Sequence, residues 1–139
     1  MGARFRRVAY VYTTLHDRPG EAFKLLARLA AGEVNLLAFG CMPVGPDRSQ
    51  LTIFPDDLGR LARVAEKEGW VLDGPHTAIL VQGDDRLGAL AEVHERLYQV
   101  KVNVFASTGV TDGHGEFGYL IYVNPGDVGT ALAALDSMR

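Results

Sequence analysis

The stretch HDRPGEAF, residues 16–23, follows the run VAYVYTTL at 8–15, and a near copy, DDRLGALA at 84–91, follows TAILVQG at 77–83. The runs that precede the two stretches are rich in β-branched and aliphatic residues, as strands are. Each stretch then passes through Asp-Arg and Gly into apolar residues at helical spacing. The sequence therefore predicts the same junction, from a strand through a tight loop into a helix, at two places.

The likeness between the two parts extends beyond these loops. At an offset of 68 residues, Asp17, Arg18, Gly20, Leu29 and Val34-Asn35 fall on Asp85, Arg86, Gly88, Leu97 and Val102-Asn103. Pro55 falls on Pro125 if two residues are added, which we ascribe to a longer second hairpin. Turn residues, helix positions and strand starts recur together, so we interpret the chain as a tandem duplication with repeats at 1–74 and 75–139.

Both repeats show the same order of predicted elements. In the first we expect strands at 5–14, 34–41, 50–54 and 70–72, and helices at 21–31 and 55–68, the latter opened by Pro55. In the second we expect strands at 77–82, 102–107 and 118–123, and helices at 88–98 and 125–137. Every helix has a single apolar stripe, so both helices of a repeat should cover one face of an antiparallel sheet. This is the α+β, ferredoxin-like plan.

The second repeat ends without residues for its own fourth strand. Its last strand is therefore missing or supplied from elsewhere, and an unpaired edge of a sheet is a liability that proteins normally cover. The long first strand, residues 70–73 or a second subunit would serve.

The composition is that of a globular protein and excludes several function classes. Hydrophobic residues make up 47% and charged residues 22%, a balance far from that of disordered chains. The net charge of −3 argues against a nucleic-acid binder, and RFRR at 4–7 is the only basic cluster. No run of about 18 apolar residues or signal peptide is visible, so we expect no membrane association. A single cysteine, Cys41, permits no internal disulfide, which favours a reducing compartment and a cytoplasmic protein.

A β-α-β-β-α-β unit with DRPG at 17–20 after its first strand, and VN at 34–35 opening its second, resembles the ACT domain. DRLG at 85–88 and VN at 102–103 carry the resemblance into the second repeat. The resemblance implies a stand-alone regulatory protein of two ACT repeats that binds a small molecule, most often an amino acid. It implies no catalytic activity and no cofactor. It also implies a ligand at the seam between ACT units, a homodimer, and a regulated enzyme acted on in trans.

The resemblance assigns the ligand to the loop after the first strand and to the start of the second strand. The residues carried over are His16, Asp17, Arg18, Pro19, Gly20 and Asn35 in the first repeat, and Asp84, Asp85, Arg86, Leu87, Gly88 and Asn103 in the second. A helix N-terminus favours a carboxylate, an aspartate accepts an ammonium group, and an asparagine amide serves either. Together these groups suit a zwitterion, although Leu87 departs from the proline of the motif.

A structural interpretation of the same residues stays open. Asp17 and Asp85 would then be N-caps, the two loop glycines would allow close packing, and Asn35 and Asn103 would hold turns. The chain would be a structural or protein-interaction module that has the ACT fold and no ligand. A small ferredoxin-like enzyme such as an acylphosphatase is a third alternative, which the duplication and the acidic loops disfavour.

No residue pattern indicates a metal site or a catalytic centre. The histidines, at positions 16, 76, 94 and 114, are scattered without the spacing of metal ligands. Cys41 has no base beside it in the sequence that would make it a nucleophile. We therefore expect neither a metal ion nor an enzyme.

Overall fold

The computed structural model describes residues 2–138 and divides the chain into two compact units. The first unit is Ala9–His76, and the second is Met1–Val8 together with Thr77–Arg139. The repeats expected at 1–74 and 75–139 concern the duplication and stay a prediction. Compared with these repeats, residues 1–8 belong to the second compact unit and residues 75–76 to the first.

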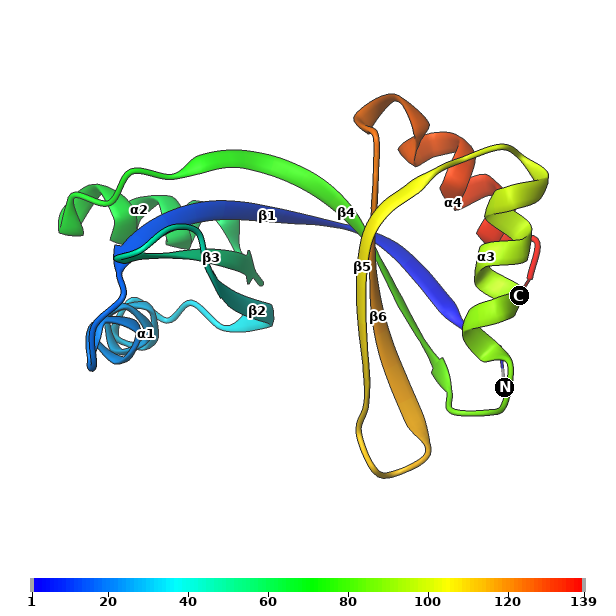
Figure 1. Cartoon of the computed structure of the whole chain (residues 1–139), viewed down its shortest axis with the longest axis horizontal. Coiled ribbons are helices and arrows are strands. Elements are labelled where there is room, and N and C mark those ends of the chain that lie inside the picture. The colour runs from blue at the N-terminus through cyan, green and yellow to red at the C-terminus, as the bar shows by residue number, and fades with distance from the viewer. Residues whose placement is uncertain (1, 139) are drawn as a thin grey trace. The chain divides into compact units, whose positions relative to one another are not determined.

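The first unit contains most of β1 (Arg4–His16), then α1 (Glu21–Ala31), β2 (Leu36–Pro43), β3 (Arg48–Pro55), α2 (Leu58–Glu68) and the start of β4 (Asp73–Asp84) (Figure 1). β3 pairs with both β1 and β2 in antiparallel register. The start of β4 lies on the other side of β1, where a Cβ at Gly74 would lie 3.0 Å from the carbonyl oxygen of Tyr10. The order within the unit is β2-β3-β1-β4.

The core of the first unit lies between this sheet and its two helices. Its buried members are Val11, Leu25, Leu29, Val34, Leu51, Ile53, Leu61 and Val64. Leu25 and Leu29 recur at the spacing of one helical face, and Leu51 and Ile53 at the spacing of one strand face. The apolar periodicity of the sequence thus becomes one continuous buried layer.

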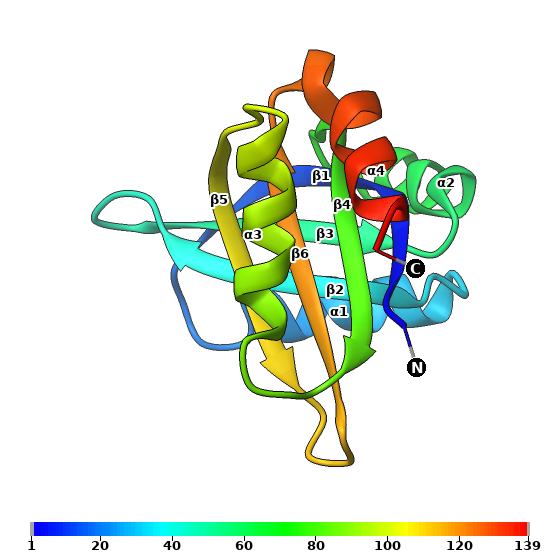
Figure 2. The same cartoon turned by 90° about the vertical axis from the view of Figure 1, so that its right-hand side faces the viewer.

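The second unit contains the rest of β4, then α3 (Ala89–Gln99), β5 (Val104–Thr111), β6 (Glu116–Val123), a short 3₁₀ turn (Pro125–Asp127) and α4 (Val128–Asp136). β6 pairs with β4 and β5, both antiparallel. Figure 2 shows α3 and α4 on the same side of these strands. The unit is therefore α+β with its helices on one face, as the sequence predicts.

The fourth strand of the second unit is the beginning of β1. Phe5 packs in the core of this unit with Ile79, Val81, Val93 and Leu97, and the order of its strands is β1-β4-β6-β5. Ala3 lies so close that a Cβ at Gly83 would be 3.1 Å from its Cβ. Of the three segments considered for this position, the long first strand occupies it.

The backbone repeats special features at the offset of 68 residues. Gly20 and Gly88 have φ values of 89° and 83°, and Glu33 and Lys101 have φ values of 60° and 59°. The pairing of β2 with β3 shifts between Leu36 and Ala38, and that of β5 with β6 shifts between Val104 and Ala106. Such bulges and left-handed residues are built into a fold individually, so their recurrence supports a common origin of the two halves.

The structure corrects three details of the sequence interpretation. Because β2, β3, β5 and β6 all keep the offset of 68, the hairpins are equally long, and the two extra residues lie at Pro125–Asp127 instead. Pro55 ends β3 and does not open α2, whose N-cap is Asp57. Residues 70–72 form no strand, since β4 begins at Asp73.

Replacing Phe5 by alanine should destabilise the second unit by about 3–5 kcal/mol, because its ring is 5% exposed within the core of that unit. Hydrogen exchange should then accelerate first at residues 79–81 and 119–121, not in β2 and β3. Denaturant unfolding gives the size of the effect.

Phe23 provides the matched control, since its side chain is 73% exposed. Phe23→Ala should change stability by no more than about 0.5 kcal/mol. The prediction would be contradicted if hydrogen exchange in the Phe5→Ala variant became faster in β2 and β3 only. Residues 4–8 would then not belong to the second unit.

Candidate functional site

Each predicted loop joins a strand to a helix and is anchored to the tip of the following hairpin. The backbone N–H of Asp17 donates to the carbonyl oxygen of Asp47 at 2.8 Å, and that of Asp85 donates to Gly115 at 2.8 Å. We call this end of each sheet the loop end. Both loops therefore have the same backbone support.

The loop aspartates are not helix caps. The N-cap residues of α1 and α3 are Gly20 and Gly88, both left-handed, and neither helix has a side-chain cap. Within the described part of the chain, the carboxylates of Asp17 and Asp85 make no hydrogen bond or ion pair. The structural interpretation of these aspartates as N-caps is wrong, and two bare carboxylates lie beside two uncapped helix starts.

The loop arginines turn toward their own helices. Arg18 lies 3.4 Å from Glu21, and Arg86 donates two hydrogen bonds to Glu92, at 3.0 and 2.5 Å. The hydrogen bonds from Arg86, and then its charge, hold the pKa of the Glu92 carboxyl below its usual value. The same contact raises the pKa of Arg86. Arg86 is therefore a residue that shapes the second loop.

A pocket of about 620 Å³ opens at the loop end of the second unit. Its lining is Asp85, Arg86, Leu87, Gly88, Ala89, Leu90 and Ala91, with Gly109, Val110, Thr111, Phe117 and Gly118 opposite. A second pocket of about 60 Å³ is lined in part by Asp84, Arg86 and Glu92. The loop residues carried over for the second repeat thus all border a cavity. The lining from β5 and β6 was not predicted, because strand residues give no sequence signal of pairing beside a loop.

The two asparagines lie at the other end of each sheet, which we call the asparagine end. Along β3, Arg48 is opposite His16 and Pro55 is opposite Leu36. Seven residue steps at about 3.4 Å therefore put roughly 24 Å between the Asp17 loop and Asn35. The same register along β6 separates Asp84 from Asn103. Within either unit, the structure does not bring the loop and the asparagine together.

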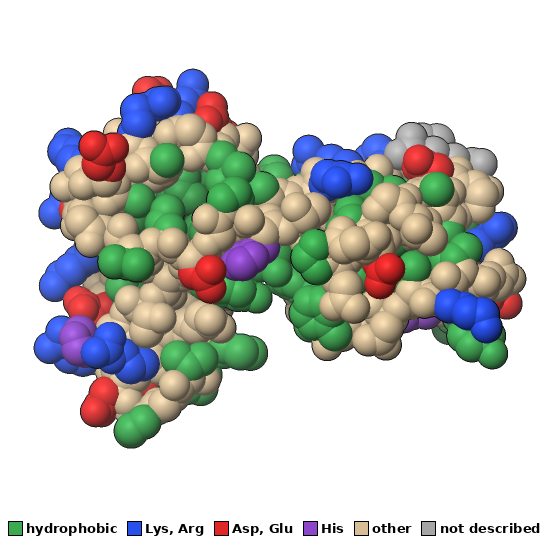
Figure 3. Space-filling view, turned by 90° about the horizontal axis from the view of Figure 1, so that it is seen from above, with side chains coloured by type: hydrophobic (Ala, Val, Ile, Leu, Met, Phe, Trp, Pro, Cys, Tyr) green, Lys and Arg blue, Asp and Glu red, His purple; other side chains and the backbone are tan. Residues whose placement is uncertain are grey.

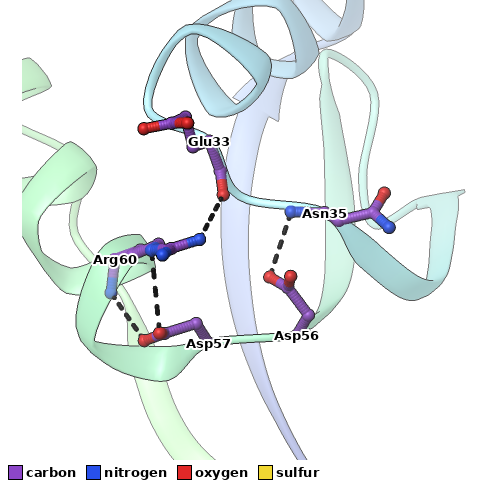
Figure 4. A network of polar contacts seen from close by, with 5 residues as sticks. All are labelled: Glu33, Asn35, Asp56, Asp57 and Arg60. Carbon is purple, nitrogen blue, oxygen red and sulfur yellow. Dashed lines mark hydrogen bonds and ion pairs between the residues drawn. The ribbon is translucent and has the colours of Figure 1, made fainter.

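The backbone of Asn35 is held by the start of α2 (Figure 4). Its N–H donates to Oδ1 of Asp56 at 3.0 Å, and the N–H of Asp56 donates back to its carbonyl oxygen at 2.8 Å. Beside it, Asp57 accepts from the N–H of Arg60, which lowers the pKa of that carboxyl, and Arg60 donates to the carbonyl oxygen of Glu33. The side-chain amide of Asn35 extends away from Asp56, so these bonds leave it free for another partner.

The surface, the side-chain clusters and the helices add three observations. On the face drawn in Figure 3, acidic and basic side chains are interspersed among hydrophobic ones. Across residues 2–138, no three His, Cys, Asp or Glu side chains gather as metal ligands would. Nor does any helix in that range have the length and apolar character needed to cross a bilayer.

No protein-family profile matches the sequence, and no curated protein matches it. Solved structures share its fold. Protein BT0572 from Bacteroides thetaiotaomicron has a TM-score of 0.81 at 15% identity, over 96% of this chain and 89% of that chain. The ligand-free regulatory subunit of aspartate kinase from Thermus thermophilus has a TM-score of 0.66 at 16% identity, over 99% and 97%. The corresponding subunit from Thermus flavus has a TM-score of 0.59 at 16% identity, over the same shares.

The Arg86–Glu92 contact predicts an acid-dependent part of the stability. The pKa of Glu92 is lower in the folded state than in the unfolded state. The contribution of the ionised carboxylate to the free energy of unfolding is therefore complete at a pH above the unfolded-state pKa. It is lost as the pH falls through the folded-state pKa. Because both side chains are about half exposed, the contribution is small: Glu92→Gln should lower Tm by about one degree near pH 7, and its Tm should converge on that of the parent protein in acid. Thermal unfolding from pH 2 to pH 7 measures this.

Glu95→Gln, on the same helix, is the control, since Glu95 is exposed and has no ion pair in the described chain. A Tm difference between Glu92→Gln and the parent that is constant across the pH range would show that the ion pair contributes nothing.

Proposed function

Because the chain has the fold of two tandem ACT domains, we propose that it is a regulatory protein that binds a small molecule, an amino acid, and catalyses no reaction. The observation that carries this proposal is the second loop, where an unpaired carboxylate and an uncapped helix start border a pocket of about 620 Å³. The Thermus proteins of the same fold are regulatory subunits of aspartate kinase. They support a regulatory role exerted in trans on a separate enzyme.

The pocket of the second unit has the groups that an amino acid requires. A ligand carboxylate would accept hydrogen bonds from the first-turn N–H groups of α3, which also carry the positive end of the helix dipole. Gly88 has no side chain to obstruct that approach. The ammonium group would pair with Asp85, and the ligand's side chain would contact the apolar parts of Leu90, Val110 and Phe117.

The asparagines would complete the site from a different unit. Roughly 24 Å separates each loop from the asparagine of its own unit, so one ligand cannot touch both. We place the ligand at a seam where the loop of one ACT unit meets the asparagine end of another. Such a seam requires two units to associate along their sheets, which fits a homodimer in the cytoplasm.

Thermal-shift measurements with each of the twenty amino acids test the proposal. A ligand at about 100 times its Kd stabilises the folded state by about 2.7 kcal/mol, so the binding amino acid should raise Tm by several degrees. Asp85→Asn should abolish most of that shift and change the Tm of the free protein only slightly, because the carboxylate makes no hydrogen bond or ion pair in the described chain and only its charge near the start of α3 is lost.

Glu66→Gln, an exposed change on α2, is the control and should keep the full ligand shift. Asp17→Asn tests the first loop in the same way and shows whether one or both repeats bind. Should none of the amino acids raise Tm at millimolar concentration, the alternative of an interaction module without a ligand would replace this proposal.

A further inference from the structure

Acidic residues adjoin the pocket of the second unit on several of its segments. Asp85 is part of the lining. Asp84, Asp112 and Glu116 each stand next to a lining residue in the chain, and all of them lie at the loop end of this unit. A ligand in the pocket would therefore lie among carboxylates.

The basic groups at this end are already engaged. Arg86 donates two hydrogen bonds to Glu92, and Arg4 lies 3.8 Å from Glu116. Among the described residues of the loop end, Glu92 included, five carboxylates thus stand against two guanidinium groups. The excess of negative charge attracts cations to the pocket and repels anions from it.

The fold itself does not require this charge. Asp84 is opposite Glu116 across β4 and β6, whereas the equivalent residues of the first unit, at the offset of 68, are His16 and Arg48. Two carboxylates directly opposite each other destabilise a sheet. The second unit thus bears an electrostatic cost that its fold does not explain, as residues of a binding site commonly do. A bound cation would reduce the repulsion.

The arrangement of the carboxylates does not suit a metal ion. Nowhere in residues 2–138 do three side chains of His, Cys, Asp or Glu approach one another as metal ligands do, although Mg²⁺ and Ca²⁺ bind several oxygen ligands at about 2.0–2.6 Å. The acidic residues lie instead around a pocket of about 620 Å³ that has Leu90, Val110 and Phe117 in its lining. A ligand that suits both features carries separated positive charges on an apolar chain.

We propose that this pocket selects a cationic amino acid, one whose side chain ends in a second positive group. The inference rests on the proposed function and names the class of its ligand. The first-turn N–H groups of α3 bind the α-carboxylate, and Asp85 pairs with the α-ammonium group. The methylene groups cover Leu90 and Val110, and the terminal cation lies in the negative field of the surrounding carboxylates. An acidic side chain is repelled by the same field.

Arginine, citrulline and agmatine test the two ends of this ligand. Citrulline has the shape of arginine with an uncharged urea group, and agmatine is arginine without its carboxylate. At matched ionic strength, arginine should raise Tm at a concentration at least ten times lower than either analogue requires. Lysine, norleucine and cadaverine form a second series with the same differences, and we expect this order in at least one series.

Each other order overturns the inference, and the order identifies what fails. If a neutral or acidic amino acid stabilises the protein as much as arginine and lysine do, the ligand class is wrong and the proposed function stands. If agmatine or cadaverine stabilises as well as its parent amino acid, the pocket binds amines without reading a carboxylate. If no amino acid raises Tm, the proposed function fails as well.

Glu116→Gln tests the negative field, and Glu66→Gln, an exposed change on α2, is its matched control. Loss of one carboxylate should raise the Kd of arginine or lysine, whichever binds, by about threefold or more at 50 mM salt. The Kd of the neutral analogue should not change. The difference should fade at 0.5 M salt, where charges are screened. Glu66→Gln should leave both affinities as they are, and titration calorimetry measures them.

The Glu116→Gln variant should fold as the parent protein does. It removes both a weak pair with Arg4 and the repulsion from Asp84, so the Tm of the free protein should change by no more than about one degree. An equal loss of affinity for the charged and the neutral compound would show that Glu116 acts on the shape of the pocket. That result, or an unchanged Kd for the cation, would overturn selection by charge.

Discussion

One strand completes two hydrophobic cores, and the rest of the structure depends on it. β1 places Val11 in the core of the first unit and Phe5 in the core of the second. The first unit takes its fourth strand from the beginning of β4, and the second takes its fourth strand from the beginning of β1. The loops, hairpins and helices that form the candidate site are attached to sheets that this exchange completes.

Local patterns in the sequence predict most of the architecture because each element carries its own signal. The β-branched and aliphatic run at 77–82 and the helical spacing at 21–31 identify a strand and a helix without knowledge of their neighbours. Pairing at the edge of a sheet depends on residues far apart in the chain. The residues next to Phe5 in the sequence therefore do not indicate that its side chain packs in the core of the second unit. The prediction that Pro55 opens a helix was wrong because proline is tolerated both at the end of a strand and in the first turn of a helix.

The candidate site likewise contains residues that local sequence patterns indicate and residues that only strand pairing brings together. Asp85 and Gly88 could be named from the sequence because a loop motif is continuous in sequence, and in the structure both line a pocket. Val110 and Phe117 come from strands that reach the loop by pairing. The equivalent positions of the two units add a further distinction, since the left-handed conformation at 33 and 101 is the same while the charges of Glu33 and Lys101 are opposite. The scaffold requires the conformation of these positions, and the surface is free to vary their chemistry.

The strand exchange also determines when each half of the protein can fold during its synthesis. Residues 9–76 contain everything that their sheet requires, so this unit can close once they have emerged from the ribosome. Residues 4–8 precede their strand neighbour β4 and the other members of their core by more than 60 residues of chain, and such distant contacts form slowly. In a nascent chain these residues therefore stay unpaired until β4 and the second half of the fold have been made.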